Sequence, residues 1–147
     1  MTKKETRLAV KIKGDFVPKY QSEGAAGCDL YAAVKGRVVI KAHDFCMIPT
    51  GIRVEIPDGY EAQVRPRSGL AKEYGIGILN APGTIDADYR GEIKVILFNY
   101  SDKPFTVKSR DRIAQLVFSK VVRARFVQTK RLRRTRRQSG GLGHTGL

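Results

Sequence analysis

The fold class is indicated most clearly by the stretch Ile52-Arg53-Val54-Glu55-Ile56-Pro57-Asp58-Gly59. Ile52, Val54 and Ile56 alternate with Arg53, Glu55 and Pro57, and a period of two residues is typical of a strand with one buried face. The Pro-Asp-Gly sequence that follows is typical of a tight turn. A short strand followed by a turn is the unit from which all-β domains are built.

The same unit recurs on both sides of this stretch. Leu8, Val10 and Ile12 alternate with polar or small residues, and 93–98 is apolar on nearly both faces, as expected of a central strand. Two further strands are predicted over 113–118 and 121–127. The one helical segment is Ser68–Tyr74, in which Ser68 can act as the N-cap. The class is therefore all-β, a barrel or jelly roll with one short helix.

Composition excludes several classes of protein. The chain has 147 residues, enough for one domain, and 41% of them are hydrophobic, which excludes a wholly disordered chain. No apolar run approaches the ~18–20 residues that cross a bilayer, and no signal peptide is visible. We expect a soluble, cytoplasmic protein without membrane contact, nuclear if the source is eukaryotic or viral. Cys28 and Cys46 lack zinc-site spacing and are expected to be reduced.

Positive charge is concentrated near the C-terminus. The formal net charge is +14, and Lys120 to Arg137 contains nine Lys or Arg and no acidic residue. Such a cluster indicates a phosphate-bearing partner. A solvated tail and a targeting signal over 130–134 explain it equally well. The following glycine-rich residues, 138–147, predict a flexible arm, so we divide the chain into a β-domain, 1–129, and an arm, 130–147.

The phosphate loop, the metal-binding motifs HExxH and CxxC, and the serine-nucleophile motif GxSxG are absent. Three other segments contain residues that could take part in chemistry. Residues 66–70 place an arginine and a hydroxyl before a short helix, which suits an anion. Residues 80–92 gather carboxylates, an amide, a phenol and an arginine around a turn; a carboxylate there can activate water. Arg137 precedes the mobile arm. Taken singly, residues 66–70 are better explained as an ordinary capped turn and the arm as a disordered tail, and residues 80–92 are also compatible with a polar hairpin.

The order and spacing of five segments carry more information than any one of them. They are Ala26-Gly27-Cys28-Asp29-Leu30-Tyr31-Ala32, Pro66-Arg67-Ser68-Gly69-Leu70-Ala71, Gly83-Thr84-Ile85-Asp86-Ala87-Asp88-Tyr89-Arg90-Gly91-Glu92, Arg112-Ile113-Ala114-Gln115, and the tail from Arg137 to Gly146. With these motifs the chain resembles the trimeric dUTPase family, over nearly its whole length. The second and third motifs are the most specific.

The resemblance implies a reaction and a metal. The family hydrolyses dUTP to dUMP and pyrophosphate with Mg²⁺, which keeps dUTP out of DNA and supplies dUMP for dTTP synthesis. Carried onto this sequence, Asp86 orients and activates the water that attacks the α-phosphorus. Asp29 holds Mg²⁺ through metal-bound water, which suits an ion that dehydrates reluctantly.

The resemblance also assigns the substrate contacts. The phosphates are expected to contact Arg67, Ser68, Gly69 and Gln115. The base is expected to contact Asn80, Gly83, Thr84 and Ile85, and the sugar Tyr89. From the closing arm, Arg137 and Leu142 are expected to contact the nucleotide. The family is a homotrimer of jelly-roll subunits, and its arm reaches a neighbour's site. This chain departs from the family at Leu142, where an aromatic residue usually stacks on uracil, and at Gln138, which replaces a glycine. We expect weaker arm closure, with activity retained.

Other functions stay open at this point. A dCTP deaminase shares the fold and parts of the motifs, and a bifunctional enzyme is the intermediate case. A non-catalytic relative that binds nucleic acid is the alternative from another class. The basic C-terminal segment also predicts weak nucleic-acid binding in an active enzyme.

Overall fold

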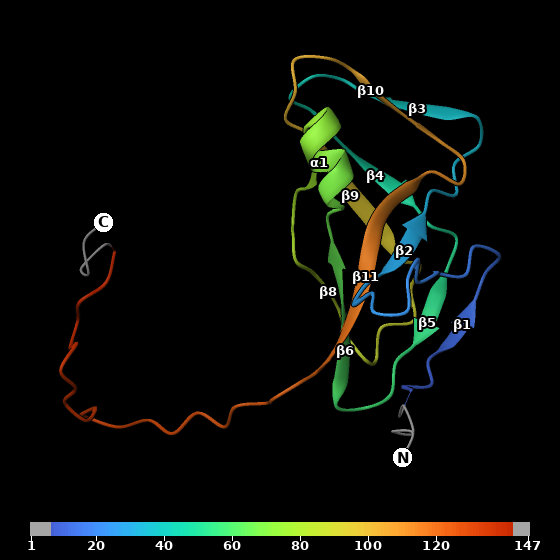
Figure 1. Ribbon diagram of the computed structural model, residues 1–147. Coiled ribbons are helices and arrows are strands. Elements are labelled where there is room, and N and C mark those ends of the chain that lie inside the picture. Colours follow the sequence, from blue (N-terminus) through green and yellow to red (C-terminus); the bar gives the residue numbers. More distant parts are fainter. Residues whose placement is uncertain (1–6, 143–147) are drawn as a thin grey trace.

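The computed structural model describes residues 7–142 and confirms an all-β architecture with one short helix (Figure 1). The elements are β1 Lys11–Lys13, β2 Cys28–Tyr31, β3 Arg37–Ile40, β4 Phe45–Pro49, β5 Arg53–Glu55, β6 Tyr60–Arg65, α1 Ser68–Tyr74, β7 Ile76–Ile78, β8 Gly83–Ile85, β9 Lys94–Asn99, β10 Phe105–Lys108 and β11 Arg112–Lys120. The strands form a barrel-like body that ends at Lys120, and the following chain runs away from it.

All strand pairs are antiparallel. The largest sheet has the order β2-β11-β6-β8, a second has the order β4-β9-β7, and β1-β5 and β3-β10 form two-stranded sheets. Their inward faces share one core, in which Leu30, Ile48, Ile52, Val95 and Leu116 have no solvent exposure. The stretch 52–56 behaves as its alternation predicts, because Ile52, Val54 and Ile56 are buried.

Strand β9 is the middle strand of its sheet, as predicted for 93–98. Val95 and Leu97 are buried, and Asn99 at its end is buried as well. The Asn99 amide nitrogen donates to the carbonyl oxygens of Ile40, Lys41 and Lys103 at 3.1, 3.2 and 2.7 Å. These bonds compensate the cost of burying the amide and join the loop after β3 to the loop after β9.

Helix α1 has the predicted bounds, but its predicted cap is wrong. Arg67 is the N-cap residue, with extended backbone and no side-chain capping bond, and Ser68 is the first helical residue. The helix ends at Gly75, whose φ of 65° closes it with a left-handed turn. The Ser68 hydroxyl is therefore not used by the helix.

One strand prediction is confirmed in part and another is wrong. The N-terminal alternation forms the short strand β1; Val10 before it packs against the core, whereas Ile12 is 36% exposed and lines a groove. Residues 121–127 form no strand; Val122 and Phe126 are each 94% exposed. The boundary at residue 129 stays a prediction. No helix within residues 7–142 is long and apolar enough to span a bilayer.

Candidate active site

The second and fourth motifs meet the first at one end of the large sheet. Asp29 on β2 is paired in register with Gln115 on β11, and Gln115 is paired with Arg65 on β6. The chain leaves β6 through Pro66 and Arg67 into α1, so Ser68 and Gly69 follow at the same end. We call Asp29, Arg67, Ser68, Arg112 and Gln115 the phosphate cluster.

The Asp29 carboxylate lies between two guanidinium groups. Its Oδ1 is 3.3 Å from Arg67 Nε, and its Oδ2 is 3.2 Å from Arg112 Nη1. The Asp29 side chain is only 10% exposed, so this charge has lost most of its water. Paired, partly buried charges of this kind hold one another in a fixed geometry. Arg112 belongs to the fourth motif but was not among the residues expected in the site, because the strand register that aims it at Asp29 is not visible in sequence.

Gln115 is fixed by a backbone bond and by a glycine. Its Nε2 donates to the Pro66 carbonyl oxygen at 3.0 Å. A Cβ atom at Gly27 would overlap Gln115 Oε1, so only glycine at position 27 leaves room for the glutamine in this position. Arg67 Nη1 also donates to the Arg112 carbonyl oxygen at 2.9 Å. Hydrogen bonds thus join two side chains of the cluster to the backbone at Pro66 and at Arg112.

The donor set fits a magnesium ion that depends on substrate for its ligands. No group of three His, Cys, Asp or Glu side chains converges within residues 7–142, so the described chain offers no all-protein cage. Asp29 supplies a carboxylate whose two oxygens retain accepting capacity beside their arginine contacts. Mg²⁺ is commonly held by one or two carboxylates together with water and substrate phosphates.

The third motif, residues 83–92, lies in a separate segment, residues 80–92, that is tied to the barrel at several points. We call this segment the 80–92 hairpin for its turn, although its one strand, β8, does not pair within it. Strand β8 pairs with β6, with Gly83 opposite Val64. Arg90 Nη1 donates to the Ala87 carbonyl oxygen at 2.6 Å, and the Gly51 amide donates to Glu92 Oε1 at 2.9 Å. The hairpin is therefore held by its own backbone and by the neighbouring loop.

The side chains expected to read the base and to activate water are free on this hairpin. Asp86 and Asn80 are exposed, and neither side chain has a hydrogen-bond partner within residues 7–142. A Cβ at Gly83 would lie 3.3 Å from Asn80 Nδ2, so the glycine brings the backbone close to that amide. The Tyr89 hydroxyl donates to the Glu92 carbonyl oxygen at 2.9 Å, and the ring lies so close to Gly91 that a Cβ there would overlap it.

Within one chain, the hairpin is far from the phosphate cluster. Strands β2 and β8 are the two edges of the large sheet, with β11 and β6 between them. Asp29 is level with Arg65, whereas Asp86 follows Ile85, which is opposite Ala62. Three strand spacings and four residues along the strands place the two carboxylates on the order of 15–20 Å apart. A single chain does not bring them together.

The arm also stands apart from both groups. Every residue from 121 to 139 is exposed, and the tail extends away from the barrel (Figure 1). Arg137 is folded back locally, with Nε donating to the Gly140 carbonyl oxygen at 2.7 Å. Gln138 and Leu142 have φ of 48°, a conformation that favours glycine. The fifth motif's last part, Gly143 to Gly146, and His144 lie outside the described residues.

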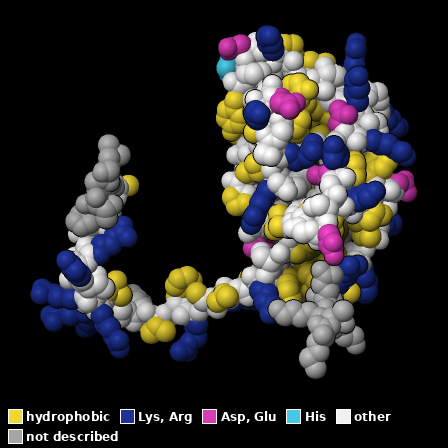
Figure 2. Space-filling view, viewed as in Figure 1, with side chains coloured by type: hydrophobic (Ala, Val, Ile, Leu, Met, Phe, Trp, Pro, Cys, Tyr) yellow, Lys and Arg dark blue, Asp and Glu magenta, His cyan; other side chains and the backbone are white. Residues whose placement is uncertain are grey.

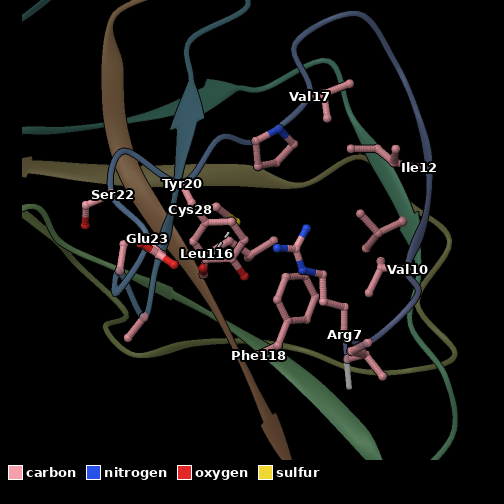
Figure 3. Close-up of a pocket in the computed structure, with 15 residues that line it drawn as sticks. Arg7, Val10, Ile12, Val17, Tyr20, Ser22, Glu23, Cys28, Leu116 and Phe118 are labelled. Carbon is pink, nitrogen blue, oxygen red and sulfur yellow. Dashed lines mark hydrogen bonds between the residues drawn. The ribbon is translucent and has the colours of Figure 1, made fainter. Parts of the chain in front are cut away.

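A pocket beside β2 and β11 is lined by none of the residues expected in the active site (Figure 3). It has a volume of about 640 Å³ and an apolar lining that includes Val10, Ile12, Cys28, Leu116 and Phe118. Burial raises the pKa of the Cys28 thiol, which keeps it protonated and unreactive. His43 contacts Asp102 at 2.8 Å and no cysteine. A Cys–His catalytic pair is therefore absent from the described residues.

Comparison with known proteins agrees with the motifs. The dUTPase family model matches residues 16–146. A deoxyuridine 5'-triphosphate nucleotidohydrolase of Caldanaerobacter subterraneus subsp. tengcongensis is 55% identical over 131 residues, covering 89% of this chain and 88% of the relative. The corresponding protein of Fusobacterium nucleatum is 46% identical over 144 residues, covering 98% and 99%.

Solved structures share the fold at lower identity. A Staphylococcus bacteriophage 80alpha dUTPase variant with dUpNHpp has a TM-score of 0.86 at 22% identity, over 95% of this chain and 99% of that one. A dUTPase variant from phage phi11 of S. aureus, described with a structural Mg(II) ion, has a TM-score of 0.77 at 20% identity, over 84% and 98%. The fold and the relatives together define an all-β hydrolase of nucleotide metabolism.

More particularly, the chain belongs to the dUTPase family. The family match extends from the N-terminal loop before β2 to the end of the glycine-rich arm, so all five motifs fall inside it.

Proposed function

We propose that the protein hydrolyses dUTP to dUMP and pyrophosphate, and that Asp86 orients and deprotonates the attacking water. The observation that carries this role is the free Asp86 carboxylate on a hairpin whose backbone is tied down by Arg90 and Glu92. A general base needs an available oxygen within hydrogen-bond reach of water and a fixed position. Asp86 meets both requirements.

The phosphate cluster binds the triphosphate in this proposal. Arg67, the unbonded Ser68 hydroxyl and the Gln115 amide supply positive charge and hydrogen-bond donors, and Gly69 allows the backbone to approach. Asp29 would hold a Mg²⁺ ion through the water bound to that ion. When bound, Mg²⁺ supplies charge neutralisation of the triphosphate and alignment for in-line attack.

The 80–92 hairpin selects the nucleotide. Asn80 and the backbone of Gly83, Thr84 and Ile85 offer donors and acceptors to the uracil edge, and the narrow turn leaves no space for a 5-methyl group. A base with the wrong edge leaves these groups unpaired, which is strongly unfavourable. The Tyr89 ring, held across Gly91, packs under the deoxyribose and excludes a 2′-hydroxyl.

The arm completes the site after binding. Arg137 reaches the terminal phosphate, and Leu142 covers the base without the stacking that an aromatic ring would add. We expect closure to be weaker than in family members with an aromatic residue at this position, because leucine does not supply the stacking on the base.

We further propose that the active site is shared among the subunits of a homotrimer. The separation of Asp29 from Asp86 within one chain supports this, because both must contact one triphosphate. The exposed segment 121–127 supports it as well: Val122, Ala124 and Phe126 alternate with Arg123 and Arg125.

A neighbouring copy offers this segment a place to dock. The groove of Figure 3 is mostly apolar, although Arg7, Ser22 and Glu23 also line it, and β1 beside it pairs only with β5 among the described residues. An unpaired strand edge next to an apolar groove accepts an added strand. The segment therefore directs each arm onto another subunit's surface.

The direct test is pyrophosphate release from dUTP with Mg²⁺, measured beside dCTP, dTTP and UTP. We expect release from dUTP alone, an activity that keeps dUTP out of DNA and supplies dUMP for dTTP synthesis. No release from any nucleotide by the folded protein would contradict the proposal. Ammonia release from dCTP would assign the chain to the deaminases instead.

A further inference from the structure

The basic segment contains more positive charge than the proposed reaction uses. Arg137 is the one cation of the arm with a role at the substrate. Immediately before it, residues 130–136 hold five cations in seven positions, namely Lys130, Arg131, Arg133, Arg134 and Arg136. We call residues 130–136 the basic tether.

The cations of the basic tether have no internal partner. Every residue of the tether is exposed, and no ion pair joins its side chains to a carboxylate within residues 7–142. Figure 2 shows the Lys and Arg side chains of the tail gathered beyond the barrel, without acidic neighbours, whereas the barrel surface in the same view mixes both signs. These charges repel one another, and contact with an external polyanion would relieve that repulsion.

The shape of the tether indicates an extended polyanion. It forms neither helix nor strand, and an extended chain advances about 3.3–3.6 Å per residue. A nucleic-acid strand places one phosphate about every 3.4 Å along the axis, so tether and strand match in charge spacing. Four of the five cations are arginine, which pairs with phosphate oxygens in a bidentate manner.

A membrane surface fits the tether less well. Interfacial membrane binding through a helix needs an apolar face on one side of the basic residues. Within the tether, Leu132 is the one apolar residue, and no helix is formed. Because the tether offers cations for phosphate groups but no apolar anchor, a nucleic acid is the better partner for it than a membrane.

We infer that the basic tether binds the phosphate backbone of nucleic acid, without regard to sequence, at a site separate from the dUTP site. This binding goes beyond dUTP hydrolysis and does not require it. It places the enzyme beside the polymer from which dUTP is to be excluded. It also accounts for the five cations of the tether, which the contact of Arg137 with one terminal phosphate does not need.

The experiment is fluorescence anisotropy of a labelled oligothymidylate of about 20 nucleotides with the full-length protein. Thymine avoids recognition by the proposed uracil site. Five phosphate contacts, at a slope of about −0.7 each, predict that affinity falls about 100-fold between about 50 and about 200 mM salt. Saturating dUpNHpp should leave the affinity unchanged, because the two sites are separate.

A matched pair of variants isolates the tether. One replaces its cations: Lys130→Gln, Arg131→Gln, Arg133→Gln, Arg134→Gln and Arg136→Gln. The control removes the same charge from the exposed surface of the barrel: Lys35→Gln, Arg37→Gln, Lys41→Gln, Lys94→Gln and Lys103→Gln. We expect the tether variant to lose at least tenfold in oligonucleotide affinity and to keep its KM for dUTP, and the control to keep both.

Three results would overturn the inference. Equal losses in the two variants would mean that net charge, and not the tether, is responsible. A raised KM for dUTP without oligonucleotide binding by the native protein would assign the tether to the substrate. Binding of vesicles rich in anionic lipid, again without oligonucleotide binding, would make the partner a membrane surface.

Discussion

The phosphate cluster and the 80–92 hairpin differ in how each holds its carboxylate side chain. In the cluster, Asp29 is nearly buried and is held by Arg67 and Arg112 at 3.3 and 3.2 Å. On the hairpin, Asp86 is exposed and has no partner among the described residues, although the backbone around it is tied down. Ion pairs therefore position the Asp29 carboxylate, whereas only the fixed backbone positions Asp86.

The difference matches the two tasks that we propose. An acceptor for the water shell of a metal ion gains from a fixed, charge-compensated environment. A base must keep an oxygen free for the reacting water. Because the two carboxylates lie on opposite edges of one sheet, we propose that each chain contributes the two kinds of carboxylate to different active sites.

Replacing Asp86 should have the largest effect on the hairpin side of this comparison. Asp86→Asn keeps the shape but removes the base, so we expect kcat to fall by about 10²–10⁴. Asp88→Asn, an exposed carboxylate on the same hairpin, is the matched control and should retain activity. Steady-state pyrophosphate release checks both variants. Equal losses in the two would remove the special role of Asp86.

Gly91→Ala should weaken sugar selection without touching the base. The added Cβ would displace the Tyr89 ring, which otherwise lies against Gly91. We expect the preference for dUTP over UTP, measured as the ratio of kcat/KM values, to fall by at least about tenfold, the lower range for a change of one methylene in a fitted pocket. An unchanged ratio would show that Tyr89 does not read the sugar.

Gly27→Ala should disturb the phosphate cluster in the same indirect way. Its Cβ would displace Gln115 Oε1, and loss of one hydrogen bond to a charged group costs about 1.5 kcal/mol or more. We expect KM for dUTP to rise by about tenfold with little change in kcat. Gly24→Ala, where no atom lies within 4 Å of the added Cβ, is the control. A similar rise in KM for both would contradict the steric argument.

Leu142→Phe should strengthen the contact between the arm and the base, and so lower KM for dUTP. An aromatic ring on the base adds about 1–3 kcal/mol of stacking, so KM should fall by about fivefold or more. Leu132→Phe, an exposed position on the tether, is the control and should leave KM unchanged. If Leu142→Phe also leaves KM unchanged, the arm does not cover the base.

Local signals in the sequence predicted much of the fold. The alternation at 52–56, the apolar run of β9 and the bounds of α1 all depend on neighbours in the chain, and the structure confirms them. Residues 121–127 have the same alternation but pair with no strand within residues 7–142. Alternation indicates a tendency to form a strand, but a strand also needs a hydrogen-bonded neighbour, so the prediction failed here.

The site was predictable only as groups of residues along the chain. Motif order identified Asp29, Arg67 and Gln115, but their contact depends on the register of β2, β11 and β6. The same register aims Arg112 at Asp29, and no local pattern encodes it. The exposure of Asp86 also follows from tertiary structure, since a carboxylate in a turn is compatible with many surroundings.

The central claim, that the cluster of one chain works with the hairpin of another, is tested most directly by mixing two inactive chains. Asp29→Asn lacks a working cluster and Asp86→Asn lacks a working hairpin, and a charged tag on one chain allows hybrid trimers to be isolated. If sites are shared around a cyclic trimer, each hybrid contains one site with both halves intact, and we predict about one third of the native activity. Hybrids that remain as inactive as either parent would contradict the account.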